Sequence, residues 1–172
     1  FNENKYFDIF IEYAKASAED ILLKITVFNR GSAVAPLHVL PTLWFRNTWD
    51  WGYPNGNEKP FLDKHAPAVV SIHHESLGTI ALYAESPDTL LFCDNETNTA
   101  RLYNSTPMHP YYKDGINDHI IQGAESINPA NSGSKAAAHF KRMIIPGKPE
   151  VFRLRMNLAG MEKPFGDFEA IF

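Results

Sequence analysis

The sequence contains a single cysteine, Cys93, among its 172 residues. One cysteine excludes an internal disulfide framework and a zinc site built from cysteine thiolates. Cys93 ends the apolar run of residues 90–93. We therefore expect it to be a small buried hydrophobic side chain rather than a reactive thiol.

Long apolar runs and dense basic runs are missing as well. No stretch approaches the roughly 20 apolar residues that a membrane-spanning helix needs, so we expect no membrane partner. The net charge is −4, and the closest approaches to a basic run are Lys141-Arg142 and the pair Arg153 and Arg155. On a strand the members of that pair share a face, but two cations are too few to follow a phosphate backbone. We expect no nucleic-acid partner.

The sequence has none of the short motifs that hold a metal or a nucleotide. Its seven histidines are scattered, without a His-x-His or His-x-x-x-His spacing. The adjacent His73 and His74 would point to opposite faces of a strand. There is no Gly-x-Ser-x-Gly elbow, phosphate-binding glycine loop or dinucleotide fingerprint. We expect neither a metal nor a cofactor.

What is present is a hydrophobic content of 44%, ample for the core of one domain. Much of it follows the period of two that is typical of β-strands. Residues 6–14 and 21–28 alternate in this way across a short polar turn, which predicts a hairpin. Further strands are predicted at residues 38–45, 69–74, 79–84, 89–94, 120–121, 137–145 and 150–157. Many short strands separated by turns predict an all-β fold, an antiparallel β-sandwich.

Prolines add detail to two of these strands. Pro36 and Pro41 flank or interrupt the strand predicted at residues 38–45, which therefore belongs at a sheet edge or contains a bulge. Residues 146–149 read Pro-Gly-Lys-Pro, which indicates a hairpin turn between the last two strands.

Two long segments, residues 46–67 and 95–117, show neither strand nor helix patterns. Both exceed the usual loop length of about 4–6 residues, and both are rich in aromatic, amide and carboxylate side chains. Binding and catalytic residues concentrate on loops, so we expect any function of the domain there.

All three tryptophans lie in residues 44–51, within a segment that continues to Tyr53. Aromatic rings beside amides and charged groups suit sugars, whose C–H faces stack on rings while their hydroxyls need polar partners. The alternative is that Trp44 and Phe45 are core and that the later tryptophans pack against a neighbouring domain. Candidate residues for substrate binding or a domain interface are Arg46, Trp49, Asp50 and Trp51.

Two polar runs supply the remaining candidates. Residues 94–98 follow a strand and include Glu96 and Asn98, either in a site or in a turn held by side-chain-to-backbone hydrogen bonds. Residues 113–119 include Asp114, Asn117 and Asp118. A catalytic carboxylate pair would need two of these acidic side chains about 5–10 Å apart across a glycosidic bond.

The final residues resemble the start of a helix. Asp167 is a plausible N-cap, and Phe168, Ile171 and Phe172 have helical spacing. So short a helix does not hold itself together. We expect a β-sandwich domain at residues 1–164 and the start of a linker helix at residues 165–172, both cut from a larger protein.

At the same loops the sequence resembles bacterial glucosidase-type proteins related to glycoside hydrolase family 63, also described as mannosylglycerate-hydrolase-like. The resemblance runs along essentially the whole chain, and long words such as Leu-Trp-Phe-Arg-Asn-Thr-Trp make it specific. The matching stretches are residues 6–15, 36–49, 95–98, 113–118, 135–139 and 164–168.

The resemblance implies a non-catalytic supersandwich domain that precedes an (α/α)6 barrel in the same polypeptide. The acid and base carboxylates of an inverting glycosidase would then belong to the barrel, and no catalytic residue is expected in this chain. The Trp49 and Asp114 loops would dock on the barrel or shape its mouth. Two alternatives remain: an autonomous carbohydrate-binding module, and a small enzyme that uses Glu96, Asp114 or Asp118.

Overall fold

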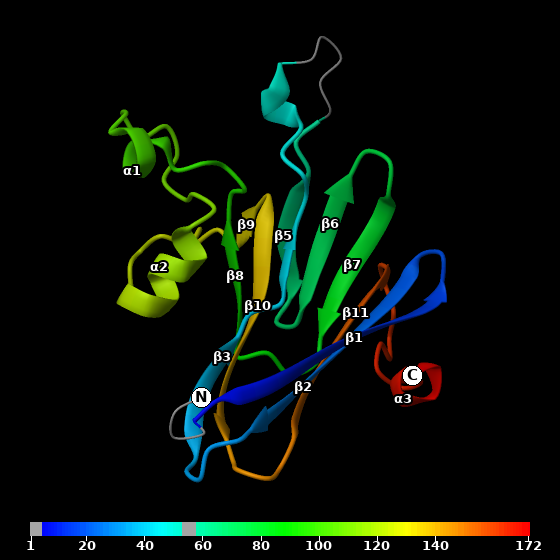
Figure 1. The fold of residues 1–172 in the computed structure, drawn as a ribbon. Helices are drawn as coiled ribbons and strands as arrows, with labels where there is room; N and C mark the ends of the chain where they lie inside the picture. Colours follow the sequence, from blue (N-terminus) through cyan, green and yellow to red (C-terminus); the bar gives the residue numbers. More distant parts are fainter. Residues whose placement is uncertain (1–4, 53–57) are drawn as a thin grey trace.

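A computed structural model describes residues 5–52 and 58–172 of the chain (Figure 1). The described residues form two antiparallel sheets packed face to face with short helices at their margins, which confirms the predicted all-β sandwich. None of the described helices is long and apolar enough to cross a membrane.

Seven of the described strands form the larger sheet, in the order β1-β2-β11-β7-β6-β5-β9. The predicted hairpin of the first two strands is confirmed, with Phe7 opposite Asn29 and Ser17 opposite Asp20. The strands of this sheet are β1 (Phe7–Ser17), β2 (Asp20–Asn29), β5 (Phe61–Ala66), β6 (Val69–His74), β7 (Gly78–Ala84), β9 (Ser132–Gly133) and β11 (Glu150–Leu158).

The smaller sheet is built around β10 (Lys135–Ile144). On one side β10 pairs with β8 (Thr89–Cys93), and on the other with β3 (Ala35–Val39) and β4 (Thr42–Trp44). β3 and β4 follow one another along that edge, and the Pro41 carbonyl accepts a hydrogen bond from the Ala138 N–H between them. The predicted interruption of an edge strand at Pro41 is confirmed.

The main core lies between the two sheets. In β10 the side chains at positions 136, 138, 140 and 144 are buried against it, as the alternation predicted. The rings of Phe140 in β10 and Phe152 in β11 meet edge to face across the core, with centroids 5.0 Å apart.

The prediction of a hairpin turn between the last two strands is wrong. β10 and β11 belong to different sheets, so residues 146–149 connect the two layers and are not a hairpin turn. A Pro-Gly sequence reverses the chain in either case, and only the partners of the flanking strands decide which connection it makes.

A second apolar cluster covers the outer face of the smaller sheet, where α2 (Gly115–Gln122) packs on Leu91, Cys93 and Ala137. Cys93 is fully buried as expected, and burial raises the pKa of its thiol to about 11. The strand predicted at residues 120–121 is wrong. Ile116 and Ile120, one helical turn apart, both face this cluster, so the segment is a helix.

The predicted absence of strands and helices in the two long segments is wrong in part. Residues 46–67 contain η2 (Trp49–Trp51) and β5, and residues 95–117 contain α1 (Thr99–Tyr103) and the start of α2. β5 has one fully buried side chain, Leu62, so it carries no alternating pattern, and pairing with β6 and β9 defines it.

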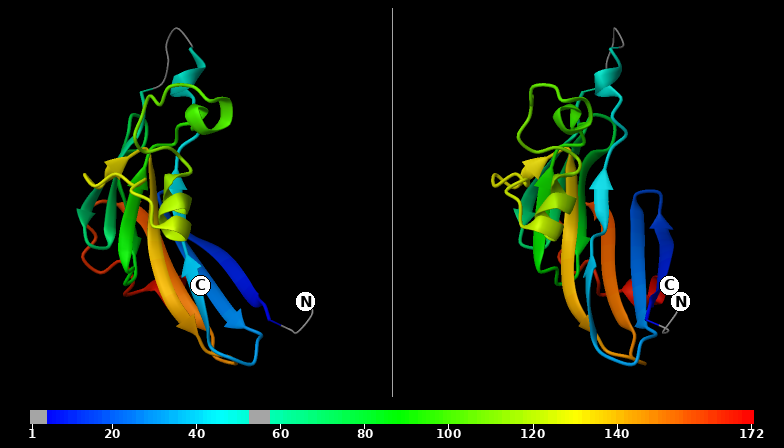
Figure 2. Two further views of the ribbon diagram at one scale, coloured as in Figure 1. Left: turned by 90° about the vertical axis from the view of Figure 1, so that its left-hand side faces the viewer. Right: turned by 60° about the vertical axis from the view of Figure 1, so that its left-hand side comes forward.

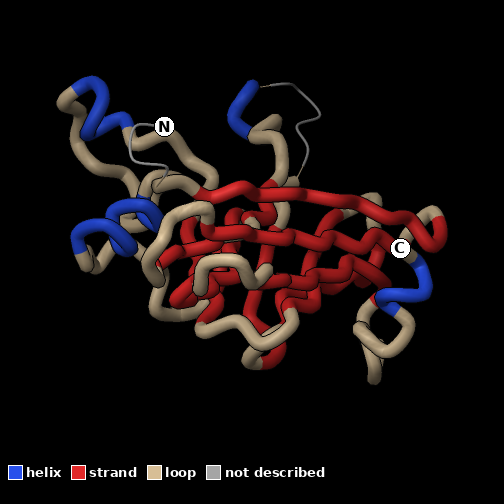
Figure 3. The backbone as a smooth tube through the Cα atoms, turned by 60° about the horizontal axis from the view of Figure 1, so that its bottom comes forward, coloured by secondary structure: helices blue, strands red, loops and turns tan. Residues whose placement is uncertain are grey.

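On the outer face of the larger sheet, α3 (Phe168–Ile171) packs against the strands, away from α1 and α2 (Figure 3). It begins after Asp167 as predicted, but the Asp167 carboxylate makes no capping bond. It accepts a hydrogen bond from Arg155, which also binds the buried Asp20 at 2.6 Å. Arg153 lies on the same face and pairs with Glu85 and Glu169, so the two arginines anchor this helix.

The larger sheet extends beyond the smaller one on the side of β1, its outermost strand (Figure 2). Ile9, Ile11 and Tyr13 point to the same side as the core residues of β2 but are 50%, 58% and 71% exposed. With Ile21 and Leu23 they continue the inner face outward, and we call these five residues the apolar shelf. A groove of about 270 Å³ runs between the shelf and the Pro41–Leu43 edge.

Candidate functional site

The loops singled out from the sequence meet at one end of the sandwich, above β8 and β10 (Figure 1). We call this region the polar end. It comprises residues 46–51, Lys59, residues 94–103 and residues 113–118. The loop that holds η2 is fastened to the end of β8 by the Asn95 amide, which donates to the Phe45 carbonyl at 2.8 Å.

Glu96 is the centre of the first group of side chains at this end. Its carboxylate accepts hydrogen bonds from the Trp49 indole at 2.9 Å and the Asn47 amide at 3.2 Å, and it pairs with the Lys59 ammonium at 3.0 Å. The same Asn47 amide donates to Asp50 at 2.9 Å. Glu96 is 7% exposed, so these contacts replace its hydration.

The surroundings of Glu96 keep it ionised. Burial works to raise the pKa of its carboxyl, but the hydrogen bonds from the Trp49 indole and the Lys59 ammonium, together with the charge of Lys59, outweigh burial and lower that pKa to about 2. Such a group does not hold a proton at neutral pH. It is therefore unsuited to act as a general acid.

Arg101 is the centre of the second group. Its guanidinium binds the carboxylates of Asp114 and Asp118, both at 2.9 Å. The Asn98 side chain donates to Asp114 at 3.1 Å and accepts from the Arg101 backbone N–H, so it also caps α1. Asp114 precedes α2 without capping it, because its carboxylate is directed to this group.

In both groups a protein side chain fills the space between two carboxylates. Asn47 lies between Asp50 and Glu96, and Arg101 lies between Asp114 and Asp118. Glycoside hydrolysis needs the scissile bond in that space. As the chain is folded, these pairs hold the loops together.

The other predicted residues are more open. Arg46 lies over the ring of Trp51, with 4.6 Å from the guanidinium carbon to the ring centroid, and Asn117 is exposed on α2. Tyr53 lies outside the described residues. Across the described ranges, no group of three or more His, Cys, Asp and Glu side chains is arranged to hold a metal ion.

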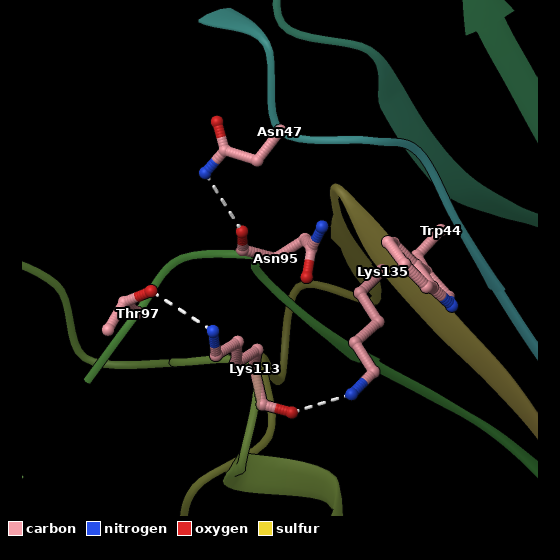
Figure 4. Close-up of a pocket in the computed structure, with 6 residues that line it drawn as sticks. All are labelled: Trp44, Asn47, Asn95, Thr97, Lys113 and Lys135. Atoms are coloured by element: carbon pink, nitrogen blue, oxygen red, sulfur yellow. Dashed lines mark hydrogen bonds between the residues drawn. The ribbon is translucent and has the colours of Figure 1, made fainter. Parts of the chain in front are cut away.

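The structure also shows a pocket that sequence reasoning missed (Figure 4). It has a volume of about 460 Å³ and is lined by Trp44, Asn47, Asn95, Thr97, Lys113 and Lys135. The alternative in which Trp44 is a core residue is wrong, since 56% of it is exposed. Trp44 ends an edge strand, and the strand alternation that places Leu43 toward the core directs Trp44 away from it.

These features define a two-sheet β-sandwich with one polar end and one open apolar face. The chain matches no family model. It is 31% identical, over an alignment of 185 residues, to the uncharacterized protein YMR196W of Saccharomyces cerevisiae. The match covers 90% of the chain and 17% of the yeast protein, so the chain spans less than a fifth of the length of that relative.

Proposed function

We propose that this chain is a non-catalytic accessory β-sandwich domain of a larger, inverting, glucosidase-like glycoside hydrolase. In this proposal it supports an (α/α)6 barrel of the same polypeptide, which carries the catalytic carboxylates. The observation that carries the proposal is the apolar shelf, a continuation of the core that no described part of the chain covers.

An exposed apolar surface that is continuous with a core marks an interaction site. Ile9, Ile11 and Tyr13 are each at least half exposed, although their strand is paired along its whole length with β2. The matched relative is several times longer than the segment it shares with this chain. The occupant we propose is therefore a neighbouring domain of the same polypeptide.

The non-catalytic part of the proposal rests on the polar end. Its carboxylates are engaged by Lys59 and Arg101, and Glu96 has a pKa of about 2. The glycosidase part rests on the resemblance of the chain to proteins related to glycoside hydrolase family 63. In that arrangement the polar end would present Trp51 and its neighbours near the mouth of the barrel.

The test is a hydrolysis assay on the chain alone and on the full-length protein, with a panel of α-glucosides and mannosylglycerate. We expect turnover by the full-length protein and none by the chain. Turnover by the chain alone would overturn the accessory role and make Glu96, Asp114 and Asp118 the first residues to replace. A full-length protein that is folded yet hydrolyses none of the panel would overturn the glycosidase assignment.

A further inference from the structure

The pocket beside Trp44 adjoins the Glu96 group, with which it shares Asn47, but its other lining side chains have a different chemistry. Trp44 in β4 and Lys135 in β10 are cross-strand partners, and Lys113 lies just before α2. Figure 4 shows the Lys135 ammonium directed to the backbone carbonyl of Lys113, the Lys113 ammonium directed to Thr97, and the Trp44 ring beside Lys135. The volume of about 460 Å³ lies within the roughly 300–1,000 Å³ of small-molecule sites.

The two lysines supply positive charge that nothing nearby pairs. The Lys135 ammonium donates to the Lys113 carbonyl at 2.6 Å, and the Lys113 ammonium donates to the Thr97 hydroxyl at 3.0 Å. Each contact uses one of the three hydrogens of an ammonium group. Neither lysine has a carboxylate within 4.0 Å among the described residues, so the remaining donors are available to a ligand.

The neighbouring carboxylates are already engaged by other cations. Lys59 binds Asp94 and Glu96, and Arg101 binds Asp114. The lysine pair in the pocket is therefore left without an acidic partner. An anionic ligand would supply it with charge-assisted hydrogen bonds, which are roughly twice as strong as neutral ones.

The rest of the lining suits a sugar. The exposed Trp44 ring offers an apolar face for the C–H side of a pyranose. The Thr97 hydroxyl retains its own hydrogen as a donor, and no described residue donates to the side-chain oxygen of Asn95. Hydroxyl groups of a sugar would find both a donor and an acceptor here.

From this arrangement we infer that the pocket binds a sugar unit that carries a carboxylate or phosphate group. The charges of Lys113 and Lys135, which both line the pocket, hold the acidic group, and the ring lies against Trp44. This site goes beyond the accessory role proposed above and does not depend on it, because every lining residue belongs to this chain.

The experiment is an NMR titration of the chain that follows the indole N–H of Trp44, assigned with a Trp44→Phe variant. The probes are glucuronate, glucose 6-phosphate, glucose and acetate. We expect saturable shifts with the two acidic sugars and binding at least about tenfold weaker with glucose and with acetate. The two acidic probes distinguish a carboxylate-bearing from a phosphate-bearing ligand.

Lys113→Met and Lys135→Met keep the aliphatic stem and remove the charge. Each should weaken binding of the preferred acidic sugar about tenfold. Lys148→Met is the matched control, since Lys148 is exposed in the β10–β11 connection, and it should leave binding unchanged. Unchanged backbone spectra of the variants establish that the fold is retained.

Three outcomes would overturn the inference. If glucose binds as tightly as glucuronate, the acidic group plays no part in binding. If acetate binds as tightly as glucuronate, the sugar ring plays no part. A calorimetric titration of the full-length protein without binding, beside binding by the chain, would show a protein contact in the pocket instead. The hydrolysis assay is independent of all three, so this inference and the proposed function can fail separately.

Discussion

The polar end and the apolar shelf differ in the kind of interaction that the chain completes by itself. At the polar end nearly every carboxylate has a cation or an amide within hydrogen-bond distance, so these loops hold themselves together. On the shelf the backbone of β1 is paired with β2, but Ile9, Ile11 and Tyr13 remain in water. The difference shows that the carboxylates have partners within the chain where the sequence looked functional, while hydrophobic burial is incomplete where it looked structural.

The largest effect on stability is expected on the opposite face of the shelf strands, where Arg155 binds Asp20. Arg155→Leu leaves the carboxylate of Asp20, which is 7% exposed, without its partner. Breaking a buried ion pair in this way costs about 3–5 kcal/mol of the free energy of unfolding. Urea denaturation measures it, and the half-exposed Arg30→Leu is the control, expected to cost less than about 1 kcal/mol. Equal losses of unfolding free energy in the two variants would show that the buried pair of Arg155 and Asp20 stabilises the chain no more than an exposed pair.

The next largest effect tests whether the polar end is held by its own contacts. Glu96→Ala leaves the Trp49 indole without its acceptor and the Lys59 ammonium with Asp94 alone, which should cost about 1–3 kcal/mol in urea denaturation. The exposed Glu162→Ala is the control. A cost near zero would show that the loops do not depend on Glu96.

The pH dependence of stability follows from the same residue. The pKa of Glu96 in the folded chain, about 2, lies below its ordinary value of 4.5. Glu96 therefore contributes stability above pH 4.5 that is lost as the pH falls from 4.5 toward 2. Denaturation curves between pH 6 and pH 3 should show this fall, and Glu96→Ala should make it shallower. Parallel curves for the two proteins would contradict the assignment.

A smaller effect is expected in the smaller sheet, at the pair His38 in β3 and His139 in β10. Their ring nitrogens are 3.0 Å apart, so one ring must be neutral for the contact to be a hydrogen bond. Burial, followed by the charge of His38, holds the pKa of His139 below its ordinary 6.5. Stability should therefore fall as the pH drops below 6.5 toward that lower pKa. His38→Asn should reduce the fall between pH 7.5 and pH 5.5, and an unchanged fall would rule out the pair as its source.

The smallest effect in the chain alone is expected on the shelf itself. Ile11→Thr keeps a β-branched side chain at a position that is 58% exposed, so stability should change by only about 0.5 kcal/mol. In the full-length protein the same change should increase hydrogen exchange in β1. Phe10→Thr, on the other face of the strand and 52% exposed, is the matched control. Equal effects of the two changes in the full-length protein would argue against docking on the shelf.

The alternation of apolar and polar residues along the chain was enough to predict the strands that direct several side chains into the core. β2, β10 and β11 appear close to the predicted positions, because each has an apolar side chain at every second residue over much of its length. β5 was missed because Leu62 is its one fully buried side chain, and α2 was misread because two adjacent isoleucines match a strand and a helix equally well.

The sequence indicated which loops carry the candidate residues, but not what those residues contact. The sequence indicated the loops around Trp49 and Asp114, and the structure brings both to one end. Their cations, Lys59 and Arg101, gave no signal, because each lies at least 13 residues from a carboxylate that it binds. The pocket at Trp44 also escaped notice, since its lining comes from four separate segments.

Local sequence patterns were sufficient to predict the fold class, the hairpin of β1 and β2, the edge strand broken at Pro41 and the burial of Cys93. These depend on the order of apolar and polar residues over a few positions, which local geometry converts directly into strand faces. The folded structure was needed to learn which sheet each strand joins, which carboxylate each cation binds, and that Trp44 and the shelf remain exposed. Those outcomes depend on which surfaces the smaller sheet covers, and no short stretch of sequence specifies how far that sheet extends.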